Sequence, residues 1–277
     1  MHKMSSSTKN ILAGIGVLML GCIFMMPVFL IFMNAFKPNK DILTNFVAFP
    51  KSLYLNNFTE AMDTMNFWVS FKNTVIVTIS TVLLSTFTSF ICAFGISHLR
   101  GRISKFFYLF FVMGQIIPFH TVMIAISVLA KKAHMNNTLW GLVVLNSGFF
   151  SSFGIMTFVG FLRGVPKELE EAATLDGCGL WRTMMQVVFP LVRPTTVTVG
   201  VLFFLWSWND FLLPSILVSE KELRTITVNL YMFKTATNAQ WNLLIAGLTL
   251  SMLPIIAIYI VAQKYITSGL TAGAVKY

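Results

Sequence analysis

Charged side chains are scarce in this sequence. Asp, Glu, Lys and Arg together make up 11% of its 277 residues, against about 25% in a typical soluble domain. Hydrophobic residues reach 56%, and the mean hydropathy is +0.76. A surface facing water on all sides needs more charge than this. The composition therefore argues against a water-soluble domain and indicates a chain that lies largely within a lipid bilayer.

Acidic residues and cysteines are also few. Ten acidic residues stand against 20 basic ones, for a net charge of +10, and the basic residues are dispersed in short segments rather than clustered on one face. This distribution argues against nucleic-acid binding and fits the flanks of membrane spans. Cys22, Cys92 and Cys178 share no metal-ligand spacing, and two of them lie in apolar runs, where a free cysteine behaves as a small hydrophobe. We predict neither a disulfide nor a metal site.

Long hydrophobic runs dominate the rest of the chain. A hydrocarbon core about 30 Å thick needs about 20 helical residues. Six runs meet this length: residues 11–33, 73–97, 106–130, 139–162, 187–209 (continuing past Asp210 towards Pro214) and 243–262. They are too long for strands, and the first is longer than the apolar part of a signal peptide. The sequence predicts an all-α membrane protein of about six transmembrane helices, forming a single domain over residues 1–277.

The basic residues of the connecting segments favour one orientation. Segments 1–10, 98–105 and 263–277 carry seven Lys and Arg in 33 residues, whereas segments 34–72, 131–138 and 219–242 carry nine in 71. Cytoplasmic segments are enriched in Lys and Arg, so the density favours cytoplasmic N- and C-termini. The longest connection, residues 34–72, has room for one or two short interfacial helices.

Residues 163–194 interrupt the hydrophobic pattern with the signals of a short helix. Pro166 is favourable as a first helical residue. Glu168, Glu170 and Glu171 follow in the early turns, where the positive end of the helix dipole stabilises acids. The segment predicts a helix that begins near Pro166.

The same segment contains a predicted turn and a second short helix. Gly177 is suited to the left-handed conformation that ends a helix, and residues 180–188 follow as a second helix that ends near Pro190. Ala172 and Ala173 would allow a partner surface to approach closely. The alternative is an ordinary capped loop with solvated acids.

Motifs in this half of the chain resemble a known family. Glu171-Ala172-Ala173-x-x-Asp176-Gly177, followed by Pro190 and Pro194, resembles the EAA loop of ATP-binding-cassette importer permeases. Trp208-Asn209-Asp210-Phe211 with Pro214, and the tail of residues 269–276, are similar to the second permease subunit of maltose-type carbohydrate importers, including multiple-sugar and raffinose permeases. The resemblance extends from about Leu53 onward. Cys178 stands where the family often has Ala.

The resemblance implies a fold, a role and partners. The fold would be that of a type I importer permease in the bacterial cell membrane, and the EAA loop would be the coupling helix that docks into a separate ATPase subunit. The residues implied in coupling are Glu171, Ala172, Ala173, Asp176 and Gly177. The partners would be a homologous second permease, two ATP-binding subunits and an extracellular solute-binding protein, with an oligosaccharide as substrate. This chain lacks G-x-x-x-x-G-K-[ST], so it would be non-catalytic and hold no cofactor, with ATP and Mg²⁺ on the partner subunits.

A sugar crossing the membrane needs hydrogen-bonding groups and aromatic faces at membrane depth. The predicted substrate pathway consists of Gln115, Asn146, Trp206, Trp208, Asn209 and Asp210. Each has an alternative: hydrogen bonds between helices for the amides, packing or an aromatic belt for the tryptophans, and simple hydration for Asp210. His120, beside the expected kink at Pro118, is interpreted as a satisfied polar residue.

Two other classes of protein remain as alternatives. A secondary transporter would need buried ionisable groups for ion coupling, and the spans offer only His120 and Asp210. A membrane enzyme would need a nucleophile, base or metal constellation, and no carboxylate pair or histidine cluster appears in the spans. Both alternatives are therefore disfavoured.

Overall fold

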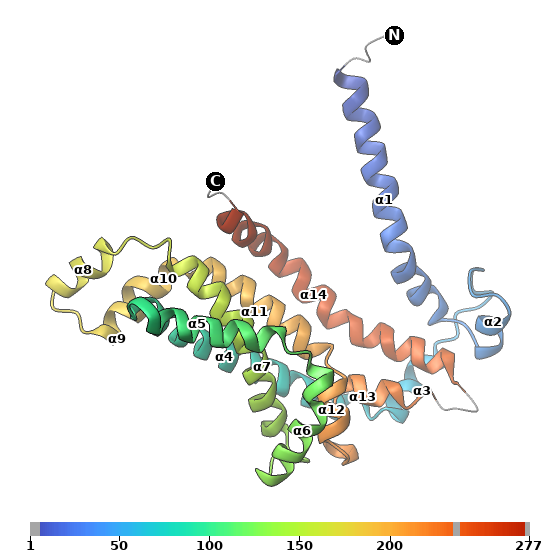
Figure 1. The fold of residues 1–277 in the computed structure, drawn as a ribbon. Helices are drawn as coiled ribbons and strands as arrows, with labels where there is room; N and C mark the ends of the chain where they lie inside the picture. Colours follow the sequence, from blue (N-terminus) through green and yellow to red (C-terminus); the bar gives the residue numbers. More distant parts are fainter. Residues whose placement is uncertain (1–5, 235–238, 275–277) are drawn as a thin grey trace. The chain divides into compact units, whose positions relative to one another are not determined.

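The computed structural model describes residues 6–234 and 239–274, and their structure is helical apart from an isolated bridge between Lys234 and Ala239. The elements are α1 (Ser6–Asn34), α2 (Asn39–Thr44), α3 (Asn56–Thr64), α4 (Phe67–His98), α5 (Gly101–Ile116), α6 (Phe119–Lys132), α7 (Leu139–Leu162), α8 (Glu168–Leu175), α9 (Leu180–Arg182), η1 (Thr183–Val188), α10 (Phe189–Leu191), α11 (Arg193–Trp208), α12 (Leu212–Leu217), η2 (Lys221–Leu223), α13 (Ile226–Tyr231) and α14 (Trp241–Ala274) (Figure 1). This confirms the all-α prediction.

Four helices of the described residues are long and apolar enough to cross a membrane, and six candidate spans result if two bent helix pairs each count as one. The four are Ala13–Asn34, Phe67–His98, Leu139–Leu162 and Trp241–Val261. The bent pairs are α5 with α6, and residues 180–191 with α11. The prediction of about six spans is confirmed, although two of them are not straight.

The expected span over residues 106–130 is not one helix. α5 and α6 meet at an angle of 100°, and Ile117 between them is extended, with φ −69° and ψ 116°. Pro118 explains the break, because its ring disfavours helical backbone at the preceding residue and it has no N–H to donate.

The expected fifth span is interrupted twice. Residues 180–191 and α11 are bent by 78°, with Val192 at φ −87° and ψ 4° between them. The prediction that helix continues past Asp210 is also wrong. α11 ends at Trp208, and a new helix begins at Leu212. Asp210 lies between the two helices, where its side chain accepts from the backbone N–H of Leu213 (3.4 Å).

The chain divides into two compact units, residues 1–67 with 229–253 and residues 68–228 with 254–277. The first unit contains α1, α2 and α3. The sequence predicted one or two short helices in the 34–72 connection, and α2 and α3 are these helices. Buried polar groups organise this connection: the Lys37 ammonium donates to the carbonyl oxygens of Asn45 and Phe46 (3.3 and 3.2 Å), and Asn57 donates to those of Ala35 and Lys37 (2.9 and 2.8 Å). Because a buried polar group is costly without partners, this network holds the connection in one conformation.

The second unit has its core where α4, α7, η1 and α11 pack together. The buried residues there are Phe90, Ala93, Phe94, Ile96, Ile155, Phe158, Val159, Leu162, Met184, Val188, Val192, Val199 and Phe203. Gly154 on α7 allows a close approach to α4, because a Cβ atom there would lie 2.7 Å from Cβ of Ser89. Small residues at such contacts are typical of helix packing in membranes.

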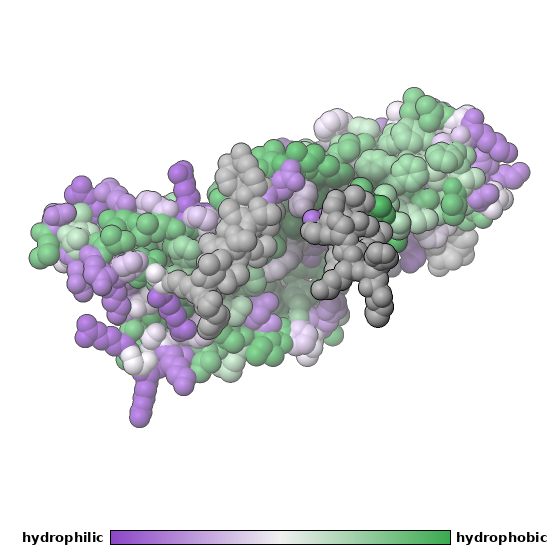
Figure 2. Space-filling view, turned by 90° about the horizontal axis from the view of Figure 1, so that it is seen from above, coloured by the Kyte–Doolittle hydropathy of each residue, from purple (hydrophilic) through white to green (hydrophobic). Residues whose placement is uncertain are grey.

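Hydrophobic side chains also cover much of the surface. Figure 2 shows them over large continuous areas of the visible face, with the hydrophilic side chains gathered in separate groups. On α1, Val17, Leu18 and Phe24 are at least 70% exposed. A surface of this kind is stable against lipid tails or a partner helix, not against water.

Candidate functional site

The EAA segment forms a short helix closed by a glycine turn. α8 ends at Leu175, and Gly177 has φ +79°. The Gly177 N–H donates to the carbonyl of Thr174 (3.0 Å), and the Cys178 N–H donates to that of Ala173 (2.9 Å). These two bonds define a Schellman motif, which requires the left-handed conformation that glycine adopts without strain. The predicted turn at Gly177 is confirmed.

The flanking elements differ in detail from the prediction. α8 begins at Glu168, two residues after Pro166, although the Leu169 N–H already donates to the carbonyl of Pro166 (3.4 Å). The second helix is present, but residues 183–188 are a π-helix, and the helical segment continues through Pro190 to Leu191. π-Helical turns are uncommon and often lie at functional sites, and nothing in the sequence pattern indicated this one.

The coupling candidates divide between two faces of the loop. Ala173 is buried, whereas Glu171, Ala172, Asp176 and Gly177 are exposed. Four large apolar side chains of the same segment are also exposed: Leu169 (41%), Leu175 (89%), Leu180 (67%) and Trp181 (60%). Sequence reasoning missed these four, because their spacing follows no helical periodicity across the glycine turn.

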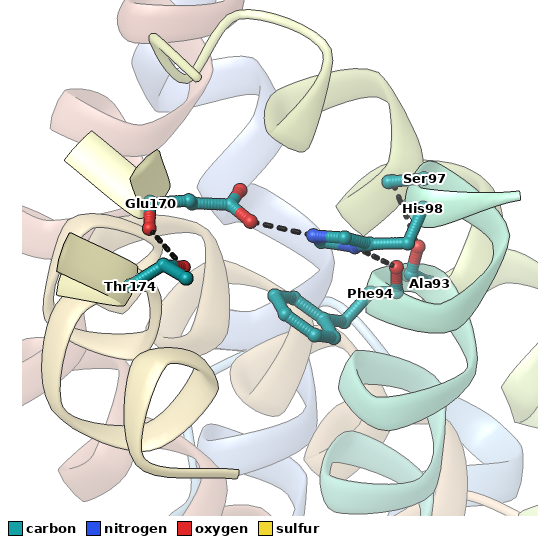
Figure 3. Close-up of polar contacts among 6 residues, drawn as sticks. All are labelled: Ala93, Phe94, Ser97, His98, Glu170 and Thr174. Carbon is teal, nitrogen blue, oxygen red and sulfur yellow. Dashed lines mark hydrogen bonds and ion pairs between the residues drawn. The ribbon is translucent and has the colours of Figure 1, made fainter. Parts of the chain in front are cut away.

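A second feature that sequence reasoning missed joins this loop to the helical core. His98, the last residue of α4, and Glu170 on α8 point toward one another (Figure 3), with 2.5 Å between Nε2 and Oε2. The other ring nitrogen, Nδ1, lies 2.8 Å from the carbonyl oxygen of Phe94. The two residues are 72 positions apart, so no local pattern could have revealed the pair.

Three of the predicted pathway residues come together in one pocket. Asn146 on α7 donates from Nδ2 to Oδ2 of Asp210 (3.1 Å), and Trp206 on α11 packs edge-to-face against Phe150 with ring centroids 5.5 Å apart. The pocket has a volume of about 170 Å³ and is lined by Phe119, Asn146, Phe149, Phe150, Trp206, Asp210 and Leu213. It combines aromatic faces with an amide and a carboxylate, the two kinds of surface that a polyhydroxylated ligand requires.

The other three predicted pathway residues lie outside this pocket. Gln115 on α5 is exposed. Trp208 is buried and stacks on Phe204, with ring centroids 5.4 Å apart. Asn209 is exposed and donates to the carbonyl oxygen of Leu205 (2.8 Å).

Among the described residues, no group of three or more His, Cys, Asp or Glu side chains could hold a metal ion. Cys22, Cys92 and Cys178 are free thiols. His120 is exposed, with its ring 6.3 Å from that of Phe119.

Several candidate membrane spans, with the short helix α8 between two of them, are the architecture of a multi-pass membrane protein. Residues 85–271 match the family model of the binding-protein-dependent transport system inner membrane component, and the chain belongs to that family. It is therefore a multi-pass membrane protein. The expected resemblance to importer permeases is confirmed.

Curated relatives cover nearly the whole chain. It is 36% identical to a probable starch degradation products transport system permease protein of Thermoanaerobacterium thermosulfurigenes, over 97% of both chains. It is 34% identical to a diacetylchitobiose uptake system permease protein of Streptomyces coelicolor, over 94% of both. Among solved structures, it matches a chain of a bacterial ABC transporter involved in the import of the acidic polysaccharide alginate, with a TM-score of 0.80, 19% identity and coverage of 96% of this chain and 99% of that one. The chain thus has the fold of an ABC importer permease.

Proposed function

We propose that this chain is the transmembrane permease subunit of an ATP-driven carbohydrate importer, in which it forms half of the translocation pathway. The observation that carries the proposal is the loop around α8 in a member of the binding-protein-dependent transport family. Its Schellman turn presents Glu171, Ala172 and four apolar side chains to solvent. Exposed large apolar side chains beside acidic ones on one loop are typical of a protein interaction site.

The partner of this loop is an ATP-binding subunit in our proposal. The chain itself carries no G-x-x-x-x-G-K-[ST] sequence. Two partner subunits therefore bind ATP and Mg²⁺, and this subunit is non-catalytic. A homologous second permease and an extracellular solute-binding protein complete the complex. Residues 1–277 act as one transmembrane domain with both termini in the cytoplasm.

The substrate is an oligosaccharide. Curated relatives at 36% and 34% identity carry the names of permeases for starch degradation products and diacetylchitobiose. A pocket lined by Trp206, Asn146 and Asp210 has the mixed aromatic and polar character that suits a sugar ring,. We assign the pathway to these three residues together with Gln115, Trp208 and Asn209.

The test of this proposal is reconstitution of the purified complex in proteoliposomes with a panel of maltotriose, diacetylchitobiose and raffinose. This chain alone is expected to give no ATP-dependent uptake, whereas the complex with its second permease, ATPase subunits and binding protein takes up at least one panel sugar. ATP-dependent uptake by the isolated chain, or no uptake of any panel sugar by the complete complex, would contradict the proposal.

The role of the loop is tested with two variants of Gly177. Its Cβ position is open, with nothing within 4 Å, so a substitution acts through the backbone alone. Gly177→Val places a branched residue at φ +79°, where left-handed backbone costs ordinary residues about 1–2 kcal/mol. Stimulated ATPase activity should fall severalfold while subunit stoichiometry is unchanged. Gly177→Asn is the matched control, since Asn tolerates this conformation. Equal activity of both variants would remove the loop from the coupling mechanism.

A further inference from the structure

Neighbouring groups hold the His98 side chain in place at its contact with Glu170. The His98 ring is fixed in two ways before it meets the carboxylate: Nδ1 lies 2.8 Å from the carbonyl oxygen of Phe94, and the ring lies over that of Phe94 with centroids 4.1 Å apart at 37°. Phe94 is itself buried in the core of the second unit. The imidazole is therefore aimed at α8 by the end of α4 (Figure 3).

The geometry also fixes how the ring is oriented. A carbonyl oxygen only accepts, so the Nδ1–H group of His98 donates to the carbonyl oxygen of Phe94,. This leaves Nε2 facing Oε2 of Glu170 at 2.5 Å. With a protonated ring, the contact is an imidazolium–carboxylate pair with a charge-assisted hydrogen bond.

Two grooves border this pair. One groove of about 640 Å³ and a second of about 420 Å³ are both lined by His98, Glu170 and Glu171. The pair therefore joins α4 to α8 at a place where the surface is hollowed. The other charged or titratable groups that line these grooves are Arg100, Arg163, Lys167, Glu171 and Cys178.

α4 is suited to carry a displacement away from this contact. It has no proline, and the 20 positions from Thr78 to His98 span about 30 Å at 1.5 Å per residue. Toward its other end, Thr78 accepts a hydrogen bond from Ser207 on α11 (3.4 Å), and Asn73 donates to the carbonyl oxygens of Glu222 and Arg224 (2.8 and 3.1 Å). The helix thus connects the loop of α8 with the segment that contains Asp210.

We infer that the contact between His98 and Glu170 transmits a displacement of α8 to α4. His98 and Glu170 are positioning residues for transport, and neither contacts substrate or nucleotide. The inference rests on the proposed coupling role of α8, and it adds the path by which a force at that helix reaches the bundle.

The test compares variants that keep or remove the hydrogen bond. In Glu170→Gln, the amide can donate to a neutral imidazole or accept from a charged one, so the contact survives. In Glu170→Ala and His98→Ala it is absent. Reconstituted complexes with all partner subunits are assayed for ATPase stimulation by binding protein with the three-sugar panel.

Both alanine variants should assemble with normal stoichiometry and lose about twofold to fivefold in ATPase stimulation, the range expected for a partly exposed ion pair. The double variant, with both residues changed to Ala, should lose no more than either single one. Glu170→Gln should keep near-native stimulation, because its amide restores the hydrogen bond. Alanine variants with native stimulation, or a Glu170→Gln variant that loses as much as Glu170→Ala, would overturn the inference. If instead Gly177→Val is also without effect, the proposed coupling role of α8 fails as well.

Discussion

At the residue scale, the pair of Asn146 and Asp210 is the clearest polar feature of the spans. The Asp210 carboxylate accepts from the Asn146 amide (3.1 Å) and from the backbone N–H of Leu213 (3.4 Å), while its own carbonyl accepts from Thr227 (2.6 Å). Such bonds hold the carboxylate in one place beside the aromatic ring of Trp206. A fixed acceptor next to an aromatic face is suited to transient contact with a sugar hydroxyl.

We expect Asp210→Asn to reduce sugar uptake while leaving assembly intact. The change keeps the shape of the side chain but removes its charge, and a hydrogen bond to a charged group contributes about 1.5–3 kcal/mol. Uptake at low sugar concentration should fall about tenfold, since about 1.4 kcal/mol corresponds to that factor. The measurement is initial uptake rate in proteoliposomes.

The matched control for this prediction is Thr157→Val on α7. Thr157 donates to the carbonyl oxygen of Phe153 (2.8 Å) and does not line the pocket. Thr157→Val should leave uptake unchanged. In the Asp210→Asn complex, the affinity of the separate binding protein for sugar should also be unchanged. Native uptake by Asp210→Asn would return this residue to a structural role.

At the scale of elements, close packing of α4 on α7 depends on the absence of one side chain. A Cβ atom at Gly154 would lie 2.7 Å from Cβ of Ser89 and 3.0 Å from Cζ of Phe203. Because helices in lipid gain no hydrophobic driving force from association, such backbone approach supplies much of their contact energy. Gly154 therefore sets the separation of these two helices.

Gly154→Ala should destabilise the second unit by about 1–3 kcal/mol, the usual cost of overpacking a well-filled core. Gly160→Ala on the same helix is the control, because nothing lies within 4 Å of its Cβ position. Thermal unfolding of the purified subunit in detergent is the measurement. A melting temperature for Gly154→Ala equal to that of the control would mean that α4 and α7 are farther apart than the structure has them.

At the scale of the whole molecule, the orientation of the chain follows from the distribution of Lys and Arg. We expect the loop of α8 and both termini to face the cytoplasm. Residues 1–5 and 275–277, with Lys3 and Lys276, lie outside the described part of the chain. Thr174 on α8 and Ser52 in the 34–72 connection are exposed. A cysteine introduced at each position can therefore report which side of the membrane its segment faces.

In a cysteine-free background, Ser52→Cys should react with a membrane-impermeant maleimide in intact cells, whereas Thr174→Cys should react only after the membrane is permeabilised. The reason is that segments rich in Lys and Arg are retained on the cytoplasmic side. Labelling yield on the purified subunit is the readout. Reaction of Thr174→Cys in intact cells would invert the topology.

Local chemistry accounts for what the sequence determined by itself. Uncharged runs of about 20 residues specify spans, because the backbone can be satisfied in lipid only within a helix. Gly177 specifies the turn after α8, since the left-handed conformation is strained for most other residues. Pro118 predicted a kink, but a proline indicates only that a helix is disturbed and does not determine the angle of the bend. The 100° angle between α5 and α6 depends on what each half packs against.

Contacts between distant residues were decided by the tertiary structure alone. Asn146 and Asp210 are 64 positions apart, and His98 and Glu170 are 72 apart. Composition and periodicity record only which residues are polar and which face of a helix they share. The packing of α7 on α11 brings Asn146 to Asp210, because a buried amide must find its partner wherever the fold brings one within reach. The contact of His98 with Glu170 depends on where the end of α4 meets α8.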